Sequence, residues 1–360
     1  MTLLEEKPVF VIAEAGVNHN GDPDRALQLV DVAAESGVDA VKFQTFDAKE
    51  IVTAKASKAL YQQASGDNEE SQREMLARLQ LDKETHCRLK QHAEERGLVF
   101  LSTAFDSPSL AFLLSDLDLQ LLKIPSGEIT NGPLLLEYAR SGRDLVVSTG
   151  MSTLEEVKTA LSVLAFGFTS GEIPSSRSFD EAFSSEVGRE ALLAHVVLLH
   201  CTTQYPTPFA NANLKAMNSL SEIFGLRVGY SDHTPGLVAA CAAVARGACV
   251  IEKHFTLDRA LPGPDHSASL EPQELSEMVE HIRTIQVALG DGEKVPQVGE
   301  LENLAVARKS LVAKVEIAKG ELFSERNLGV KRPGIGRSPM DYWDLIGSPS
   351  DKAYRPDQLI

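Results

Sequence analysis

Eight short apolar runs recur between Val9 and Thr256, and each is followed by a segment in which apolar residues return every three or four positions. The runs have the length of buried strands, and segments such as DRALQLVDVAAESG have the period of amphipathic helices. The pattern therefore predicts eight strand–helix units. The runs are VFVIAEAG from Val9, AVKFQTF from Ala40, LVFLSTAF from Leu98, LQLLKIPSGE from Leu119, DLVVSTG from Asp144, HVVLLHCTT from His195, LRVGYSDHT from Leu226 and ACVIEKHFT from Ala248.

Strand alternating with helix eight times is typical of an α/β protein with a parallel (β/α)8 TIM barrel, which we predict for residues 1–290. The alternative is an open, doubly wound parallel sheet. No GxGxxG follows any of the runs, so the usual cofactor fingerprint of that alternative is missing. The closed barrel is the favoured architecture.

The pattern changes after residue 290. The stretch GDGEKVPQVGELEN is rich in turn formers and charge, and it predicts a linker over residues 291–304. Residues 305–360 hold short strand-like pieces, SLVAKVEIA and NLGVKRPG, broken by Gly and Pro, and they predict a small β-rich C-terminal domain. A second irregular stretch, Gly167–Glu190, is interpreted as a surface insertion.

Composition narrows the classes of partner. With 43% hydrophobic residues the chain can bury a sizeable core, and its formal net charge of −16 argues against nucleic acid or an anionic membrane as a partner. The four cysteines lack metal-type spacing, so we expect reduced, structural thiols. The N-terminus has no signal-peptide pattern, and no apolar run is long enough to span a membrane, so a cytoplasmic protein is expected.

Polar side chains end every one of the predicted strands. In a barrel of this kind the carboxyl ends of the strands meet at one face, where the reacting groups of barrel enzymes lie. We therefore expect these side chains to converge on one site. They are Glu14, Lys42, Gln44, Thr103, Lys123, Ser126, Glu128, Ser148, Thr203, Gln204, Ser231, Asp232, His233, Glu252 and His254.

The spacing of these residues indicates which of them share a face. Side chains alternate along a strand, so Glu252 projects with His254, and Lys42 projects with Gln44. Lysines, hydroxyls, carboxylates and histidines around one cavity suit an anion, such as a phosphate or carboxylate, beside a divalent metal. Taken singly, Lys123 could instead lie along the core and Glu128 could cap a helix.

His233 and His254 end neighbouring predicted strands and are the candidate metal ligands. Two histidines are too few for a typical zinc site. A hydrated, octahedral ion of the manganese type fits two imidazoles better.

The ordered motifs IAEAGVNHNGD, VKFQTF, LSTAFD, KIPSGE, VSTGM, HCTTQYPTP, GYSDHT, IEKHFTLD and LPGPDHSASLEP resemble those of the sialic acid synthase family. The resemblance covers essentially the whole chain. The C-terminal stretch ARKSLVAKVEIAKGELFSERNLGVKRPGIGRSP is similar to the antifreeze-like (SAF) domain, a β-clip fold, that is joined to those barrels.

The resemblance implies a transferase that condenses phosphoenolpyruvate with open-chain N-acetylmannosamine and water, giving N-acetylneuraminate and phosphate by C–O cleavage. It implies catalytic carboxylates at Glu14 and Glu128, and Mn²⁺, or else Mg²⁺ or Co²⁺, on His233 and His254. Thr203 stands where some members have Asn on the phosphoenolpyruvate side. The other implied phosphoenolpyruvate contacts are Lys42, Thr103, Lys123, Ser126, Ser148 and Ser231, and the implied sugar contacts are Gln44, Tyr205 and Asp265.

The resemblance also implies that Arg332 reaches from the SAF domain of one subunit into the barrel of its partner, so that a domain-swapped homodimer shares its sites. Two alternatives stay open. One is an N,N'-diacetyllegionaminate synthase that uses a 2,4-diacetamido-trideoxy-mannose, and the other is a non-catalytic sugar-binding protein.

Overall fold

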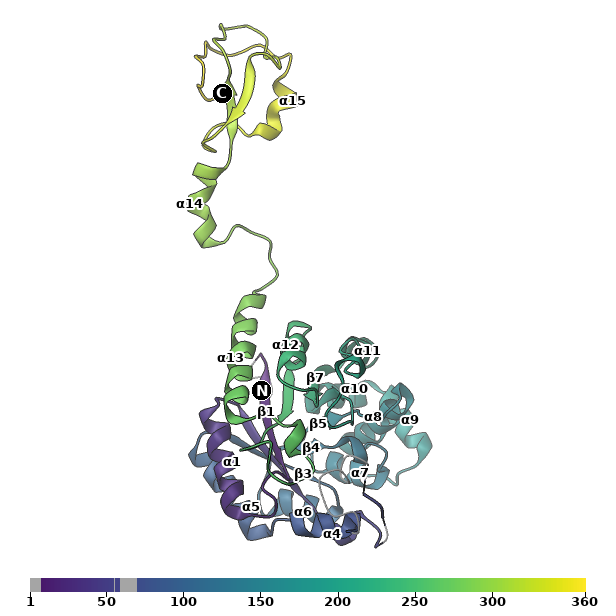
Figure 1. Cartoon of the computed structure of the whole chain (residues 1–360). Coiled ribbons are helices and arrows are strands. Elements are labelled where there is room, and N and C mark those ends of the chain that lie inside the picture. The colour runs from purple at the N-terminus through teal and green to yellow at the C-terminus, as the bar shows by residue number, and fades with distance from the viewer. Residues whose placement is uncertain (1–7, 55, 59–69) are drawn as a thin grey trace. The chain divides into compact units, whose positions relative to one another are not determined.

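The computed structural model describes residues 8–54, 56–58 and 70–360. Eight parallel strands pair in chain order and close between β8 and β1, so the predicted (β/α)8 barrel is confirmed and the open sheet is excluded (Figure 1). Each strand lies within its predicted run. Their bounds are β1 Phe10–Gly16, β2 Ala40–Thr45, β3 Val99–Ala104, β4 Leu121–Ile124, β5 Asp144–Ser148, β6 Val196–Cys201, β7 Arg227–Asp232 and β8 Val250–His254.

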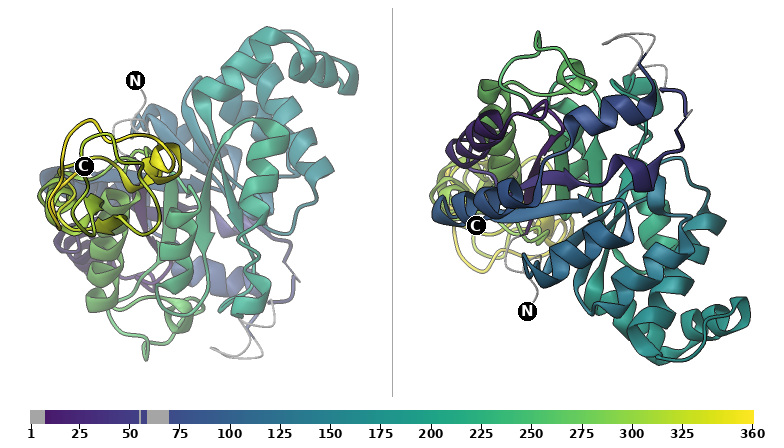
Figure 2. Two further views of the ribbon diagram at one scale, coloured as in Figure 1. Left: turned by 90° about the horizontal axis from the view of Figure 1, so that it is seen from above. Right: turned by 90° about the horizontal axis from the view of Figure 1, so that it is seen from below.

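Helices surround the ring of strands (Figure 2). Several begin at side chains that accept a hydrogen bond from the first helical turn, such as Asp22, Asp82 and Asp106. Among the described residues, no helix combines the length and apolar character needed to cross a membrane. The helices of the barrel unit are α1 Pro23–Glu35, α2 Ala48–Ile51, α4 Gln72–Leu79, α5 Lys83–Glu95, α6 Ser107–Ser115, α7 Gly132–Arg140, α8 Leu154–Thr169, α9 Ser176–Ser184, α10 Glu186–His195, α11 Ala216–Phe224, α12 Val238–Ala245 and α13 Pro272–Leu289.

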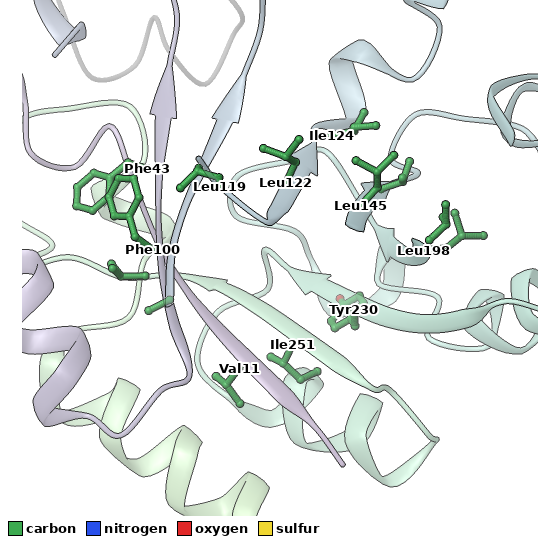
Figure 3. Packing of buried hydrophobic residues seen from close by; sticks show 14 of the residues in the cluster. Val11, Phe43, Phe100, Leu119, Leu122, Ile124, Leu145, Leu198, Tyr230 and Ile251 are labelled. Carbon is green, nitrogen blue, oxygen red and sulfur yellow. The ribbon is translucent and has the colours of Figure 1, made fainter. Parts of the chain in front are cut away.

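The two faces of the strands pack into two separate cores. The outer face packs against the helices, and Figure 3 shows part of this layer, in which the rings of Phe43 and Phe100 stack with centroids 5.8 Å apart. The inner face fills the lower part of the barrel with apolar side chains. They are Phe10, Ile12, Ala40, Leu101, Leu121, Val146, Val197, Leu199 and Val250.

The inner face becomes polar at the carboxyl ends of the strands. Two residues beyond Ile12 comes Glu14, two beyond Ala40 comes Lys42, and two beyond Val250 comes Glu252. Because alternate residues share a face, each strand that lines the apolar interior directs its last polar side chains into the mouth of the barrel.

The stretch Gly167–Glu190 is helical for most of its length, so its interpretation as irregular was wrong. Helix α8 continues to Thr169, and α9 and α10 follow, beside α8. Ser175 and Ser185, which look like loop residues in the sequence, accept hydrogen bonds from the first turns of α9 and α10. The serines therefore mark helix starts.

The C-terminal part, from Asp291 to Ile360, forms its own compact unit. Its strands β9 Ser310–Ala313 and β10 Leu328–Lys331 pair antiparallel, and α15 spans Tyr342–Leu345. A small core that includes Leu311, Phe323 and Tyr354 holds the unit together. Helix α14, Val298–Ala307, occupies the second half of the segment that the sequence predicted as a linker.

Candidate active site

A cavity of about 420 Å³ opens at the carboxyl ends of the barrel strands. Of the polar strand-end residues expected to converge, Gln204 and Asp232 do not line it, and Asp232 instead pairs with Lys253 on the outer face of the strands. All the residues to which a catalytic, substrate or metal role was assigned in the barrel do line it. They are Glu14, Lys42, Gln44, Thr103, Lys123, Ser126, Glu128, Ser148, Thr203, Tyr205, Ser231, His233, His254 and Asp265. Strand register brings several together, since Glu14 pairs with Lys42 on one side and with His254 on the other.

The floor of this cavity is a buried cluster of two carboxylates and two ammonium groups. Lys42 forms an ion pair with Glu14, and its Nζ lies 3.6 Å from Oε2 of Glu252. The Nζ of Lys123 lies 3.5 Å from Oε1 of Glu252, which also accepts a hydrogen bond of 2.8 Å from Ser231. Burying these charges is tolerable only because they are paired.

The two carboxylates of the floor have opposite pKa shifts. Burial raises the pKa of Glu14 to about 7, although Lys42 opposes the rise. Burial also acts to raise the pKa of Glu252, but Lys123 and Lys42 outweigh it and lower that pKa to about 2. Glu252 is therefore the permanent counter-ion, and Glu14 is the carboxylate that can exchange a proton near neutral pH.

Hydroxyl groups surround the lysines. Lys42 donates to Oγ1 of Thr103 at 3.1 Å, and Oγ of Ser126 accepts from the backbone N–H of Gly150 at 3.0 Å. Oγ1 of Thr203 is buried and has no hydrogen-bond partner among the described residues. A buried donor without a partner is what a bound anion would satisfy.

His233 and His254 lie close together at the rim, with ring centroids 5.6 Å apart. Nδ1 of His233 donates to the carbonyl of Thr202 at 2.8 Å, so its Nε2 carries the lone pair. Nδ1 of His254 is buried without a partner among the described residues. Burial lowers the pKa of both imidazoles, which keeps them in the neutral form that binds metals.

The pair therefore fits a metal that takes two protein nitrogens and completes its shell with water or substrate. No group of three or more His, Cys, Asp or Glu in the described part of the chain is arranged to hold a metal. Tyr205 lies beside the pair, with its ring tilted by 40° to that of His233 and the two centroids 4.2 Å apart.

Two loops fix the position of Asp265. The amide of Asn18 donates to the carbonyl of Phe255 and to Ser269, and Asn20 donates to the carbonyl of Pro262, so the loop after β1 is tied to the loop after β8. Burial raises the pKa of Asp265 to about 6. This carboxyl faces the cavity with no charged group offsetting its burial.

The structure adds lining residues to which the sequence assigned no role. Cys201 shares a strand face with Leu199, so alternation could have identified it, as alternation did identify Glu252 beside His254. The apolar lining residues had no such signal, because a hydrophobic residue in a sequence is read as core. They are Val17, Phe46, Ile51, Val52, Met75, Leu76, Leu79, Phe105 and Met151.

Arg332 belongs to the C-terminal unit, directly after β10. Its Nε donates to the carbonyl of Ala307 at 2.9 Å. The predicted contact of Arg332 with a partner's barrel stays a prediction.

Known proteins match this chain over nearly its whole length. N,N'-diacetyllegionaminic acid synthase of Campylobacter jejuni is 49% identical over 98% of this chain and 99% of its own length. The protein of that name from Legionella pneumophila is 44% identical, over 94% of this chain and 89% of its own. The solved N-acetylneuraminic acid synthetase of Leptospira borgpetersenii is 33% identical, covers 83% of this chain and 90% of its own, and superposes with a TM-score of 0.66.

The predictions of an enzyme and of a sialic-acid-synthase type are thus confirmed. Residues 29–294 match the NeuB family, and residues 308–360 match the SAF domain. This chain is a member of the NeuB family that carries a C-terminal SAF domain.

Proposed function

We propose that the chain condenses phosphoenolpyruvate with 2,4-diacetamido-2,4,6-trideoxy-mannose and water, giving N,N'-diacetyllegionaminate and phosphate. The observation that carries the choice of sugar is the 49% and 44% identity to two synthases named for that product, against 33% to a synthetase named for N-acetylneuraminate. We therefore propose the diacetamido trideoxy sugar, which belongs to the alternative drawn from the sequence, in place of N-acetylmannosamine, which the sequence favoured first.

The floor of the cavity supports an anionic enol substrate. Lys42 and Lys123 are buried cations beside the hydroxyls of Thr103, Ser126 and Ser148. In a chain of net charge −16 they supply local positive charge for the phosphate and carboxylate groups of phosphoenolpyruvate.

The reaction forms one carbon–carbon bond and breaks one carbon–oxygen bond. The methylene carbon of phosphoenolpyruvate attacks the open-chain aldehyde, water adds at the carbon that bears phosphate, and phosphate leaves to give the 2-keto acid. Glu14 is positioned beside Lys42 and has a raised pKa of about 7, so it is the candidate base for the water.

A divalent metal, Mn²⁺ by preference and otherwise Mg²⁺ or Co²⁺, would be held by His233 and His254. When bound, it would supply Lewis-acid polarisation of the aldehyde oxygen. The chain's own part is to keep both imidazoles neutral through burial. The hydrogen bond from Nδ1 of His233 to the carbonyl of Thr202 leaves Nε2 of this ring without a proton.

Phosphate release from phosphoenolpyruvate, followed with each sugar and with product mass by mass spectrometry, tests the proposal. We expect the diacetamido trideoxy sugar to give the higher kcat/KM and a nine-carbon product with two acetamido groups. Chelator and the His254→Ala variant are expected to remove most of the activity. A clear preference for N-acetylmannosamine would overturn the choice of sugar, and undiminished release by His254→Ala would overturn the metal site.

A further inference from the structure

The cavity has one apolar side, above the ends of β2 and β3. Phe46 and Phe105 follow those two strands, and their rings meet edge to face with centroids 6.1 Å apart. The other members come from α2 and α4 and the residue after α2. This apolar wall comprises Phe46, Ile51, Val52, Met75, Leu76 and Phe105.

All residues of the apolar wall except Val52 belong to a small core that is separate from both cores of the barrel strands. Phe46 and Met75 are buried within it, while Ile51, Leu76 and Phe105 pack against them and stay half-buried. Apolar surface that remains open on one side of a polar cavity is suited to cover an apolar part of a ligand.

This step rests on the proposed function, because the proposed reaction determines which part of the sugar can lie against the apolar wall. The aldehyde carbon must meet the enol carbon of phosphoenolpyruvate, whose anionic groups are drawn to Lys42 and Lys123 in the floor. An open six-carbon chain that begins at the floor extends toward the loops after the strands, and the apolar wall is the hydrocarbon part of the cavity lining among those loops.

We propose that the apolar wall selects sugars that lack oxygen at C6. A C6 methyl group packs against Ile51, Leu76 and Phe105 and is removed from water. A 6-hydroxyl in the same place loses its water without gaining a partner from these hydrocarbon side chains. Because an apolar pocket rejects an added hydroxyl only moderately, the preference for the 6-deoxy sugar is on the order of 10- to 100-fold in kcat/KM.

The test compares two sugars that differ only at C6: 2,4-diacetamido-2,4,6-trideoxy-mannose and its 6-hydroxy counterpart. Phosphate release is measured with each at saturating phosphoenolpyruvate. The unmodified protein should favour the 6-deoxy sugar, and Leu76→Asn should move the ratio of the two kcat/KM values toward one while leaving the KM for phosphoenolpyruvate unchanged.

Two further variants separate recognition from damage to the fold. Ile51→Asn changes a residue of the apolar wall at the end of the short helix α2. It should shift the ratio of the two kcat/KM values in the same direction as Leu76→Asn. Leu114→Asn places the same change at a half-buried leucine of α6 that packs against the outer core. It should lower stability without changing the ratio.

The outcomes distinguish a failure of the apolar-wall proposal from a failure of the proposed function. A ratio near one in the unmodified protein, or a ratio that neither wall variant changes, overturns the role of the apolar wall and leaves the proposed function intact. If neither diacetamido sugar releases phosphate, the proposed function fails and the wall proposal fails with it.

Discussion

At the scale of single residues, Gly150 shows how closely the site is packed. A Cβ at this position would lie 2.4 Å from Oγ1 of Thr203, 2.6 Å from Oγ of Ser126 and 2.8 Å from Sγ of Cys201. Gly150→Ala must therefore displace side chains that line the cavity. We expect a loss of about 1–3 kcal/mol in stability from overpacking and a fall of about tenfold or more in kcat/KM from their displacement.

Urea unfolding and phosphate-release kinetics measure these two effects. Gly171→Ala is the matched control, because a Cβ there meets nothing within 4 Å, and it should change neither quantity. Unchanged kinetics in Gly150→Ala would show that the hydroxyls around it do not contribute to the reaction.

Asp265 illustrates a buried carboxyl whose ionisation opposes folding. Its pKa rises from 3.8 to about 6 through burial, so the folded state holds the proton more tightly than the unfolded state. The stabilisation from this proton is complete below pH 3.8 and is lost as the pH rises through about 6. Across that window the protein loses up to about 3 kcal/mol.

Asp265→Asn removes this titration. The variant should be more stable than the parent at pH 7.5 and gain nothing at pH 4, as measured by urea unfolding at both values. Because Asp265 faces the cavity, we also expect a higher KM for the sugar. An equal stability difference at the two pH values would contradict the assigned cause.

At the scale of elements, a buried ion pair ties β7 to β8 on the outer face of the barrel. Nζ of Lys253 lies 2.8 Å from Oδ2 of Asp232, and both side chains are fully buried. Asp232 also accepts from the backbone N–H of Thr234, and Lys253 donates to the Thr234 carbonyl. These bonds hold the turn that carries His233, and Lys253 adjoins His254 in the chain.

Lys253→Met should therefore cost about 3–5 kcal/mol, because it leaves the carboxylate of Asp232 buried and unpaired. The double variant Lys253→Met/Asp232→Asn should recover part of that loss, since no charge is then left alone. Lys331→Met, at the exposed pair with Asp357, is the control and should have little effect. Thermal and urea unfolding compare the four proteins, and a double variant no more stable than the single one would rule out the unpaired charge as the cause.

At the scale of the whole molecule, the shared site of a domain-swapped homodimer stays a prediction, as does the cytoplasmic location. If Arg332 completes the site of a partner, a hybrid of one Arg332→Ala subunit and one His254→Ala subunit contains one intact site. Such a hybrid, purified through two different tags, should have about half the activity of the parent dimer. Sites that are complete within one subunit would leave the hybrid with no more activity than its parts.

Much of the architecture is encoded locally. Alternation along each strand and the helical period between strands predicted all eight barrel strands, and the same alternation predicted that Glu14, Lys42, Glu252 and His254 share one cavity. The serines of Gly167–Glu190 misled because a serine in a loop and a serine that caps a helix look alike without the following turn.

The sequence by itself determined the strands, their inward-facing positions and the polar character of the mouth, because these depend on periods of two and of three to four residues. The tertiary structure decided which charges pair, since Lys42 meets Glu14 through the register of β1 with β2 and meets Glu252 only through barrel closure between β8 and β1. It also decided that Ile51, Leu76 and Phe105 line the cavity. The sequence does not show whether a hydrophobic side chain faces a core or a substrate, because its burial depends on which other parts of the fold pack over it.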